Sequence, residues 1–465
     1  MALASTYFYD SNNADRQTLH RRIRPSESQF NEQQDRWNAL KDYLLQKLTE
    51  VSGYPTRSWL QGSYKFGTQI RPVRLGDEFD IDLGVYYCWP GEPDDADHEP
   101  KTLKSFVQDA LKDFAAQNDD VKMVAEPSKP RCCRIHFDGA FHIDVPCYHL
   151  DSDADARALA TEDNEWEDSD PKALYKWFTS KFDPGPRDRV RRLIRYMKAW
   201  VALKLGENAE RPSSVLITVL VAIAYSAKGD DVQGPEDEAF AEIVGGILDI
   251  VSSGQDVRNP VDDSENLAGR MSVDSWQTFV DGLEVLQGIA SGAVQCESEA
   301  EACSGWARAF EHLFPLPDDE KLEEEACNLP ALRTLPQVSV FAVSRDNPRF
   351  AYHGTNEIGP IRKNCSITFR ITNVDLMPHG TQFVWVVRNE GREAESVNDL
   401  GHRAGVGLTA EERSAYNGTH YMDCTAFVSN RIVGIRRVKV TVSGDRAARR
   451  TPGKKPRYVS LRGRR

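Results

Sequence analysis

The chain has 465 residues, enough for two or three domains with a substantial core. Its formal net charge of −13 is unevenly distributed, because residues 431–465 carry +12 and the rest of the chain carries −25. An acidic body of this kind excludes a general nucleic-acid coat protein.

The composition also argues against membrane insertion and export. The most apolar stretch, residues 215–227, is too short to cross a bilayer, and residues 1–12 lack the basic region and apolar run of a signal peptide. The nine cysteines show neither a paired framework nor a metal-type spacing. We therefore expect no membrane insertion, reduced thiols and a cytoplasmic location.

A glycine-serine turn followed by two acids on one strand is the most informative pattern in the chain. Gly62 and Ser63 are predicted to open a helix, with Gly62 allowing close backbone approach and Ser63 offering its hydroxyl and backbone N–H to phosphates. Because side chains alternate along a strand, Asp80 and Asp82 point together into a cleft while their apolar neighbours enter the core.

A third acid, Asp144, lies in the later segment Phe-His-Ile-Asp-Val, which has the same alternation. Clustered carboxylates repel one another and require a cation, and Mg²⁺, with Mn²⁺ as an alternative, is bound through oxygen ligands. Asp80, Asp82 and Asp144 are therefore the predicted catalytic residues and metal ligands of a two-metal site beside a nucleoside triphosphate.

Each of these features also has an ordinary structural explanation. A single Asp-x-Asp is most often a solvated strand face or a turn, and a single Gly-Ser is a weaker signal still. Their order, their spacing and the third acid together favour nucleotidyl transfer.

In these residues the chain resembles the polymerase-β-type nucleotidyltransferase superfamily. Within it, Gly-Ser-Tyr-x-x-Gly-Thr, Asp-Ile-Asp-Leu-Gly-Val and the later Asn259-Pro260-Val261 resemble the bacterial cGAS/DncV-like nucleotidyltransferases (CD-NTases, SMODS type) of anti-phage (CBASS) signalling. The resemblance covers about residues 30–330. It implies Mg²⁺, nucleoside triphosphates as substrates, a cyclic di- or trinucleotide second messenger as product, and a separately encoded effector protein that responds to it.

The implied fold class is α+β. A nucleotidyltransferase catalytic core is expected over residues 1–185, and a helical lobe that completes the nucleotide cleft is expected over residues 186–330. Further on, a small β-sandwich is expected over residues 331–445, followed by a disordered basic tail at residues 446–465.

A helix is predicted over residues 187–205, with one apolar and one basic stripe at helical spacing. The basic stripe, Arg191, Arg195 and Lys198, is also explained by a solvated face. The resemblance implies instead that Lys198, which precedes Trp200 by two positions, contacts nucleotide phosphates, with Arg195 as a further nucleotide-binding residue.

The next helix is predicted to begin at Ser213 or Ser214, directly after Pro212, and either serine suits an N-cap. The resemblance implies that a hydroxyl at this point contacts a triphosphate, and Ser213 is the residue we assign to that contact.

The chain changes character near residues 328–336, where prolines mark a linker. Short strands separated by turn residues then predict the β-sandwich. Residues 385–394, 399–401 and 416–424 resemble the AGS-C sensor domain often fused to these enzymes, although residues 401–405 depart from the family pattern. The resemblance implies an activating ligand of unknown identity.

Within the sandwich, Trp385 is predicted to be a core residue. A second set is predicted to form a recognition surface: Arg388, Asn389, Arg403, Tyr416 and His420.

The basic tail is predicted to be a solvated segment that lacks a fixed structure. Docking onto nucleic acid or onto the acidic body of the chain is the alternative. A nucleotidyltransferase needs only an aligned hydroxyl as acceptor, so Tyr458 or Ser460 is a candidate protein primer for an attached oligonucleotide.

Two classes of function remain open. One is an enzyme that makes a cyclic messenger, with linear oligonucleotide synthesis, or transfer to a small molecule or protein, as the other enzymatic alternatives. The other is an inactive fold that senses a nucleotide or nucleic acid. The three retained acids favour the enzyme, because an inactive fold would keep their repulsion without a physical reason.

Overall fold

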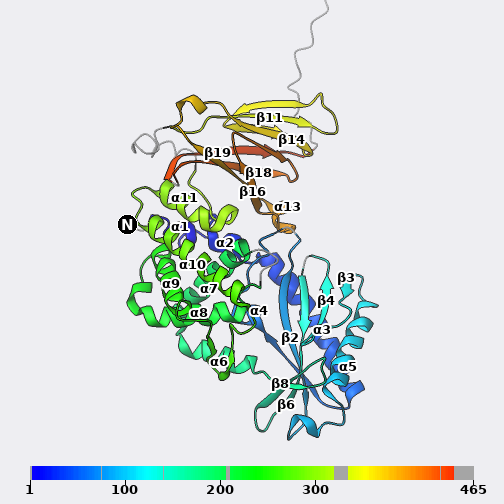
Figure 1. Ribbon diagram of the computed structural model, residues 1–465. Coiled ribbons are helices and arrows are strands. Elements are labelled where there is room, and N and C mark those ends of the chain that lie inside the picture. The colour runs from blue at the N-terminus through cyan, green and yellow to red at the C-terminus, as the bar shows by residue number, and fades with distance from the viewer. Residues whose placement is uncertain are drawn as a thin grey trace, which may run out of the picture. The chain divides into compact units, whose positions relative to one another are not determined.

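The structure is a computed structural model that describes residues 3–74, 76–139, 141–205, 210–318, 334–429 and 431–444. The chain divides into two compact units (Figure 1). The first comprises Met1–Asp318 and Glu395–His402, and the second comprises Asp319–Ala394 and Arg403–Arg465. The predicted division of the first unit at residue 185 stays a prediction, and the predicted tail at residues 446–465 lies outside the described residues.

The first unit mixes helices with one large sheet. Its helices are α1 (Ser5–Phe8), α2 (Leu19–Ile23), α3 (Glu27–Ser52), α4 (Gly62–Phe66), α5 (Pro100–Ala115), α6 (Pro171–Lys181), α7 (Pro184–Lys204), α8 (Ser214–Lys228), α9 (Glu236–Val251), α10 (Val273–Val294) and α11 (Glu299–Phe310). Its strands are β1 (Thr56–Gln61), β2 (Phe79–Cys88), β3 (Val121–Val124), β4 (Cys133–Phe137), β5 (Phe141–Val145), β6 (Cys147–Asp151), β7 (Ala156–Ala160), β8 (Trp166–Asp168), β9 (Arg258–Asn259) and β10 (Asp262–Asn266).

The large sheet has the order β3-β4-β5-β2-β6-β7-β8, with β1 paired to β2. Strands β5 and β6 both run parallel to β2, and the remaining pairs are antiparallel. Because β5 pairs directly with β2, the acids predicted on these two strands lie side by side in the middle of the sheet.

One face of this sheet packs on α3 and α5 (Figure 1). Leu40, Leu44 and Leu48 of α3 meet Leu103 and Val107 of α5 over the apolar residues of β2. In β2 the predicted alternation is confirmed, because its core-facing positions are at most 2 % exposed, namely Phe79, Ile81, Leu83 and Val85. The opposite face carries Asp80 and Asp82, followed by Gly84 and the buried Tyr86.

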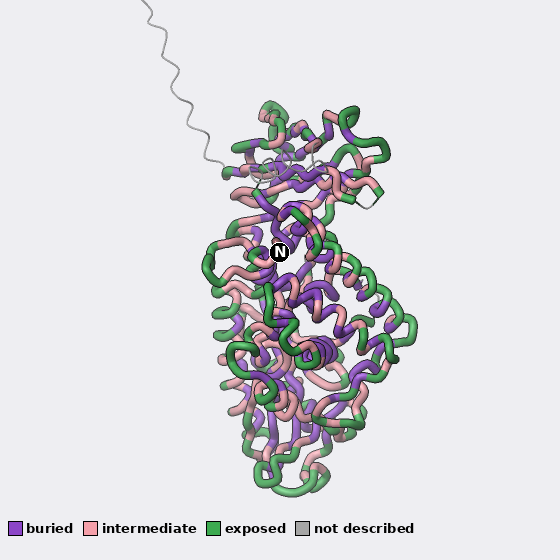
Figure 2. Tube along the Cα trace, turned by 90° about the vertical axis from the view of Figure 1, so that its left-hand side faces the viewer, coloured by how far each residue is buried: buried purple, intermediate pink, exposed green. Residues whose placement is uncertain are grey.

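The helices that follow the sheet pack around an aromatic core. Phe8 of α1 contacts Tyr196 of α7, Phe240 of α9 and Trp306 of α11. Figure 2 shows how buried residues concentrate along these helices and along the strands. Helix α7 begins at Pro184, three residues before the predicted start, because a proline is well tolerated in the first turn of a helix.

Part of the later chain belongs to the first unit. Residues 395–402 lie in it, and there Arg22 donates to the carbonyl of Leu400 at 2.8 Å while Gln29 donates to Asn398 Oδ1 at 3.0 Å. The first unit therefore contains a segment from beyond residue 330.

The second unit is a sandwich of two sheets. Its elements are β11 (Val338–Ser344), β12 (Ala351–Thr355), β13 (Glu357–Ile361), β14 (Cys365–Ile371), β15 (Gln382–Asn389), β17 (Thr409–Arg413), β18 (Gly418–Val428) and β19 (Arg431–Val442), together with the parts of α13 (Arg392–Ser396) and β16 (Gly401–Val406) that lie outside residues 395–402. The sheet orders are β12-β11-β14-β17 and β13-β19-β18-β15-β16, and one apolar core contains residues of both. The chain is thus an α+β protein with a sheet-rich C-terminal region, as predicted.

Trp385 is fully buried in this core, as predicted. The predicted recognition surface is wrong for three of its five residues, since Arg388, Asn389 and His420 are all less than one tenth exposed. Arg388 forms an ion pair with the equally buried Asp423 on the adjacent strand. A charged side chain can be buried when a partner of opposite charge accompanies it, and no pattern along a single strand reveals that partner.

Candidate active site

Strand β1 delivers the Gly-Ser turn to the polar face of the sheet. Gln61 pairs with Asp82 across β1 and β2, and α4 begins at the next residue, Gly62. Gly62 has a φ of +56°, and a Cβ built on it would lie 1.8 Å from Asp82 Oδ2. Only a residue without a side chain allows the backbone to pass this close to the carboxylate.

The three predicted acids converge on two neighbouring strands. Asp80 and Asp82 are two residues apart on β2, and Asp82 lies directly opposite Asp144 on β5. Ligand atoms of Asp80, His142 and Asp144 lie within 4.8 Å of one another. The parallel register therefore brings together residues that are more than sixty positions apart in sequence.

Asp82 is buried beside two other carboxylates. Burial, and then the nearby carboxylates of Asp80 and Asp144, raise the pKa of Asp82 well above its ordinary value, although Arg134 and Lys198 oppose the rise. A divalent cation bound by oxygen ligands relieves both the desolvation and the repulsion. The donor set at this point therefore fits a hard divalent ion.

Asp144 has a cationic partner that the sequence analysis did not anticipate. Arg134 of β4 donates to both carboxylate oxygens, at 2.5 and 2.7 Å, and Lys129 Nζ lies 3.6 Å away. Burial opposes ionisation of Asp144, but these cations outweigh it and hold the pKa of the carboxyl below its ordinary value. The alternation Arg134, His136 along β4 was the signal that could have revealed this polar row.

Lys198 of α7 is a buried cation that lines the same cavity as Asp82 and Asp144. It is 7 % exposed, and its Nζ donates to Thr68 Oγ1 at 3.2 Å. Burial, and then the positive charge of Arg195, lower the pKa of Lys198 to about 7 against the opposing influence of Asp82 and Asp80. A phosphate group beside this amine would supply the counter-charge that keeps it protonated.

Two other predicted nucleotide-binding residues are engaged elsewhere in the structure. The Arg195 guanidinium donates to the carbonyls of Gly67 and Gln69, so it holds the loop that follows α4. Ser213 is the N-cap of α8, and its Oγ accepts from the N–H of Leu216 at 3.2 Å. The neighbouring Ser214 lines the cavity beside the acids. Nucleotide contacts by Arg195 and Ser213 stay predictions.

A cavity of about 760 Å³ joins these groups within the first unit. Gly62, Ser63, Asp82, Asp144 and Lys198 line it, and so do residues that were not assigned a role from the sequence: Gln61, Arg131, Tyr148, Arg157 and Arg270. Tyr148 stacks on Tyr86, with ring centroids 4.9 Å apart, and Gln61 bonds to both hydroxyls. No motif in the sequence marks these residues, so only the folded chain shows that they line the same cavity.

Comparison with known proteins agrees with this arrangement. Residues 56–148 match the model of the nucleotidyltransferase domain of DncV-like cyclic GMP-AMP synthases, and residues 319–443 match the adenylyl/guanylyl and SMODS C-terminal sensor domain. A cyclic GMP-AMP synthase of Escherichia albertii is 30 % identical over 451 residues, which cover 96 % of this chain and 98 % of that protein. The cyclic GMP-AMP synthase of Vibrio cholerae is 26 % identical over 223 residues, covering 38 % of this chain and half of that protein.

Among solved structures, the Vibrio cholerae di-nucleotide cyclase DncV in complex with GTP superposes with a TM-score of 0.57 at 20 % identity. The alignment covers 68 % of this chain and 99 % of that one. The fold and the site thus define a nucleotidyltransferase enzyme. The chain belongs to the cGAS/DncV-like nucleotidyltransferases that carry a C-terminal AGS-C sensor domain. Among the helices that the structure describes, none has the length and apolar character needed to span a membrane.

Proposed function

We propose that this enzyme joins nucleoside triphosphates into a cyclic di- or trinucleotide. The observation that carries the proposal is the convergence of Asp80, Asp82 and Asp144 beside the backbone of Gly62, at a cavity that also contains Lys198. The volume of this cavity falls in the usual range for small-molecule sites. The E. albertii relative, named as a cyclic GMP-AMP synthase, supports the product class.

In the proposed reaction a ribose hydroxyl of one nucleotide attacks the α-phosphate of another, a phosphodiester bond forms, and pyrophosphate leaves. A last transfer within the linear intermediate closes the ring and releases a further pyrophosphate. Mg²⁺ is the proposed ion, with Mn²⁺ as an alternative, and when bound it lowers the pKa of the attacking hydroxyl and neutralises charge on the leaving pyrophosphate. Asp80, Asp82 and Asp144 would hold it.

The chain's own groups would orient the substrates. Ser63 lies in the first turn of α4, where its hydroxyl and the backbone N–H groups suit a phosphate. Lys198, held by Thr68, would donate to a phosphate oxygen and become fully protonated there. Arg134 keeps Asp144 ionised.

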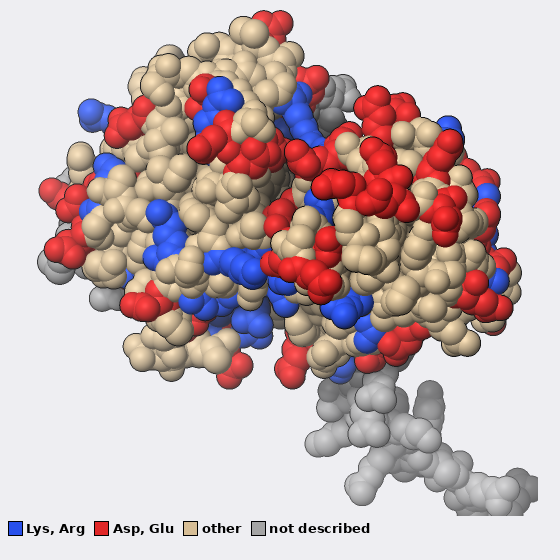
Figure 3. Space-filling view, turned by 90° about the horizontal axis from the view of Figure 1, so that it is seen from below, with Lys and Arg blue, Asp and Glu red and all other residues tan. Residues whose placement is uncertain are grey.

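The biological setting is part of the proposal. We propose that the product is a second messenger in anti-phage defence, read by a separately encoded effector protein, and that the sensor domain binds an activating ligand. Nucleoside triphosphates are cytoplasmic metabolites, which supports a cytoplasmic location. On the face in Figure 3, groups of acidic side chains are interspersed with basic ones, a surface poorly suited to coating nucleic acid.

The test is product identification with the full chain. The purified protein is incubated with labelled ribonucleoside triphosphates and Mg²⁺ or Mn²⁺, and products are analysed by mass spectrometry. Asp80→Asn and Asp82→Asn should abolish incorporation, whereas Asp281→Asn, at an exposed acid on α10, should leave it intact. Products that all keep a 5′-triphosphate would replace the cyclic product by a linear one. A mass increase confined to the protein would indicate priming from Tyr458 or Ser460.

A further inference from the structure

A second polar cluster lies next to the three acids, on the same face of the sheet. Glu78 directly precedes β2, His136 lies on β4 and His142 lies on β5. His136 and His142 are paired across the β4–β5 hairpin, and Asp80 pairs with His142 on the other side. The register thus forms a row His136, His142, Asp80 next to the row Arg134, Asp144, Asp82.

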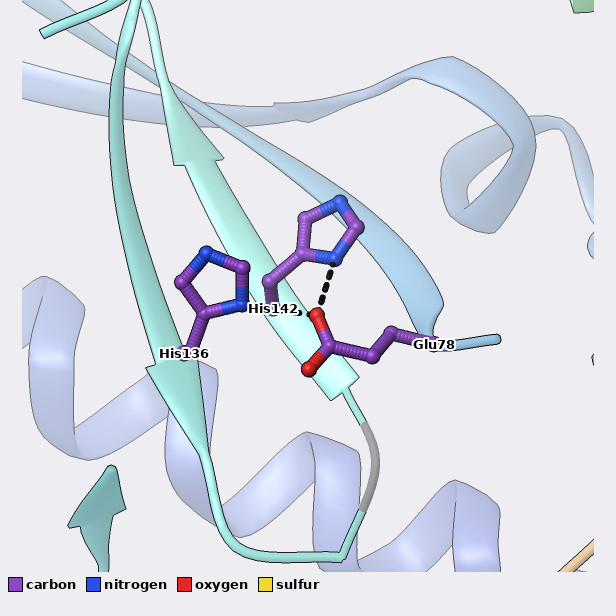
Figure 4. Close-up of side chains that lie close together, drawn as sticks. All are labelled: Glu78, His136 and His142. Carbon is purple, nitrogen blue, oxygen red and sulfur yellow. Dashed lines mark hydrogen bonds and ion pairs between the residues drawn. The ribbon is translucent and has the colours of Figure 1, made fainter. Parts of the chain in front are cut away.

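The three side chains of the cluster converge on one point (Figure 4). Nδ1 of His136 lies 2.7 Å from Glu78 Oε2, and Nδ1 of His142 lies 3.0 Å from the same oxygen. The potential ligand atoms of all three lie within 4.8 Å of one another. In a tetrahedral site with bonds of about 2.0–2.1 Å, ligand atoms are separated by roughly 3.3 Å. The two separations from Glu78 Oε2, 2.7 and 3.0 Å, are a few tenths of an ångström shorter than that spacing, so these ligand atoms would move slightly apart when an ion binds.

The other nitrogen of His142 supplies an independent observation. His142 is only 7 % exposed, and its Nε2 makes no hydrogen bond, although Asp80 Oδ1 lies 3.0 Å away. A buried imidazole with one nitrogen directed at a carboxylate and the other at a ligand group has the geometry of a metal-bound histidine. In that state Nδ1 is the ligand and Nε2–H faces Asp80.

The chemistry of the ligands selects a different ion from the one expected at the three acids. Two imidazoles and one carboxylate suit Zn²⁺ and similar transition metals, whereas Mg²⁺ prefers oxygen ligands alone. The side chains of Glu78 and His136 keep 18 % and 19 % exposure, which leaves a path for the ion and room for water as a fourth ligand.

We propose that Glu78, His136 and His142 form a binding site for a transition-metal ion of the Zn²⁺ class, distinct from the site of the three acids. The two imidazoles are held by a hairpin of fixed register, so little conformational entropy is lost when the ion binds. The bound ion fixes the ring of His142 beside Asp80 and thereby connects the two sites.

The test measures metal binding to the full chain without nucleotide. The protein is stripped with a chelator, and Co²⁺ is titrated in as a spectroscopic substitute for Zn²⁺, followed by competition with Zn²⁺. We expect one equivalent with the visible absorption of a tetrahedral ion, displaced by Zn²⁺. His136→Ala and Glu78→Gln should each weaken Co²⁺ binding at least about 100-fold, because losing a residue that binds the metal costs at least as much as losing one that only hydrogen-bonds to a ligand.

Two variants serve as controls. His353→Ala removes a histidine from β12 of the second unit, and Asp82→Asn removes an acid of the neighbouring site. Both should retain the tetrahedral signal. Thermal unfolding of every variant establishes folding, and Glu78→Gln, which preserves side-chain size, decides the matter if His136→Ala does not fold.

Three results would overturn the proposal: wild-type protein without a tetrahedral Co²⁺ signal, a sulfur-to-cobalt charge-transfer band that assigns the ion to cysteine, or unchanged binding in folded Glu78→Gln. The first result would leave two histidines that simply donate hydrogen bonds to Glu78. Because the titration contains no nucleotide, its failure would not affect the proposed synthase activity.

Discussion

An alanine at position 62 would place a methyl group where the Asp82 carboxylate lies. A Cβ there would be 1.8 Å from Asp82 Oδ2, and ordinary contact begins at 3.4 Å, so the carboxylate must retreat by roughly 1.6 Å. Misplacement of a catalytic group by about 1 Å can reduce the rate about 10²-fold. We therefore expect Gly62→Ala to lower nucleotide incorporation by at least that factor.

The structure provides a matched control for the backbone. Gly53 also has a positive φ, +75°, but a Cβ built on it meets nothing within 4 Å. Left-handed backbone costs a non-glycine residue about 1–2 kcal/mol, partly offset by the lower entropy of the unfolded chain. Gly53→Ala should therefore lower the free energy of unfolding by about 1 kcal/mol without affecting synthesis.

The assay combines urea unfolding with product formation under identical conditions. Both variants should remain folded, and only Gly62→Ala should lose activity. Incorporation by folded Gly62→Ala within threefold of that by Gly53→Ala would refute the argument, because Asp82 would then tolerate displacement or have no role in the reaction.

Three further variants separate the charges of the site. Asp82→Asn should abolish synthesis yet raise the free energy of unfolding of the metal-free protein. Carboxylates two residues apart on a strand, at roughly 6.6 Å, repel each other by about 2.5 kcal/mol at an effective dielectric constant near 20. A fall in the free energy of unfolding would show that no repulsion is relieved. Asp144→Asn should instead lower the free energy of unfolding, measured with denaturant, by about 1–3 kcal/mol, because the half-buried Arg134 keeps its charge but loses its carboxylate partner. Unchanged stability would contradict the ion pair between Arg134 and Asp144. Lys198 has a pKa of about 7 in the folded protein against an ordinary value of 10.5, so between pH 7 and 10.5 the unfolded chain binds one more proton than the folded protein. The free energy of unfolding should therefore rise with pH in this range, by up to about 5 kcal/mol relative to Lys198→Met. Parallel curves of stability against pH for wild type and Lys198→Met would exclude the lowered pKa.

Patterns that repeat along the chain were sufficient for much of the fold. The alternation in β2 indicated which side chains enter the core, since burial on a strand depends on parity. The proline and serines at residues 212–214 indicated the start of α8, because an N-cap requires only a side chain and the N–H groups a few positions later. The sandwich was also predictable from a local pattern, namely short strands separated by turn residues.

Partners across strands were beyond the reach of such patterns. Nothing local to Asp144 announces that Arg134 donates to both its oxygens, and nothing local to Arg388 announces that Asp423 permits its burial. Nothing in the basic stripe of α7 announces that Arg195 donates to the carbonyls of Gly67 and Gln69, and its contact with nucleotide stays a prediction. These outcomes depend on which strand or loop arrives beside the residue.

The sequence by itself determined the chemical character of the site, because Gly62, Ser63 and the acids of β2 lie close together in the chain and their spacing has a direct geometric meaning. The register of β4, β5 and β2 decided the rest. It placed Asp144 opposite Asp82 and His142 between His136 and Asp80. Register is a property of the assembled sheet, since a shift by one residue would turn each of these side chains to the opposite face.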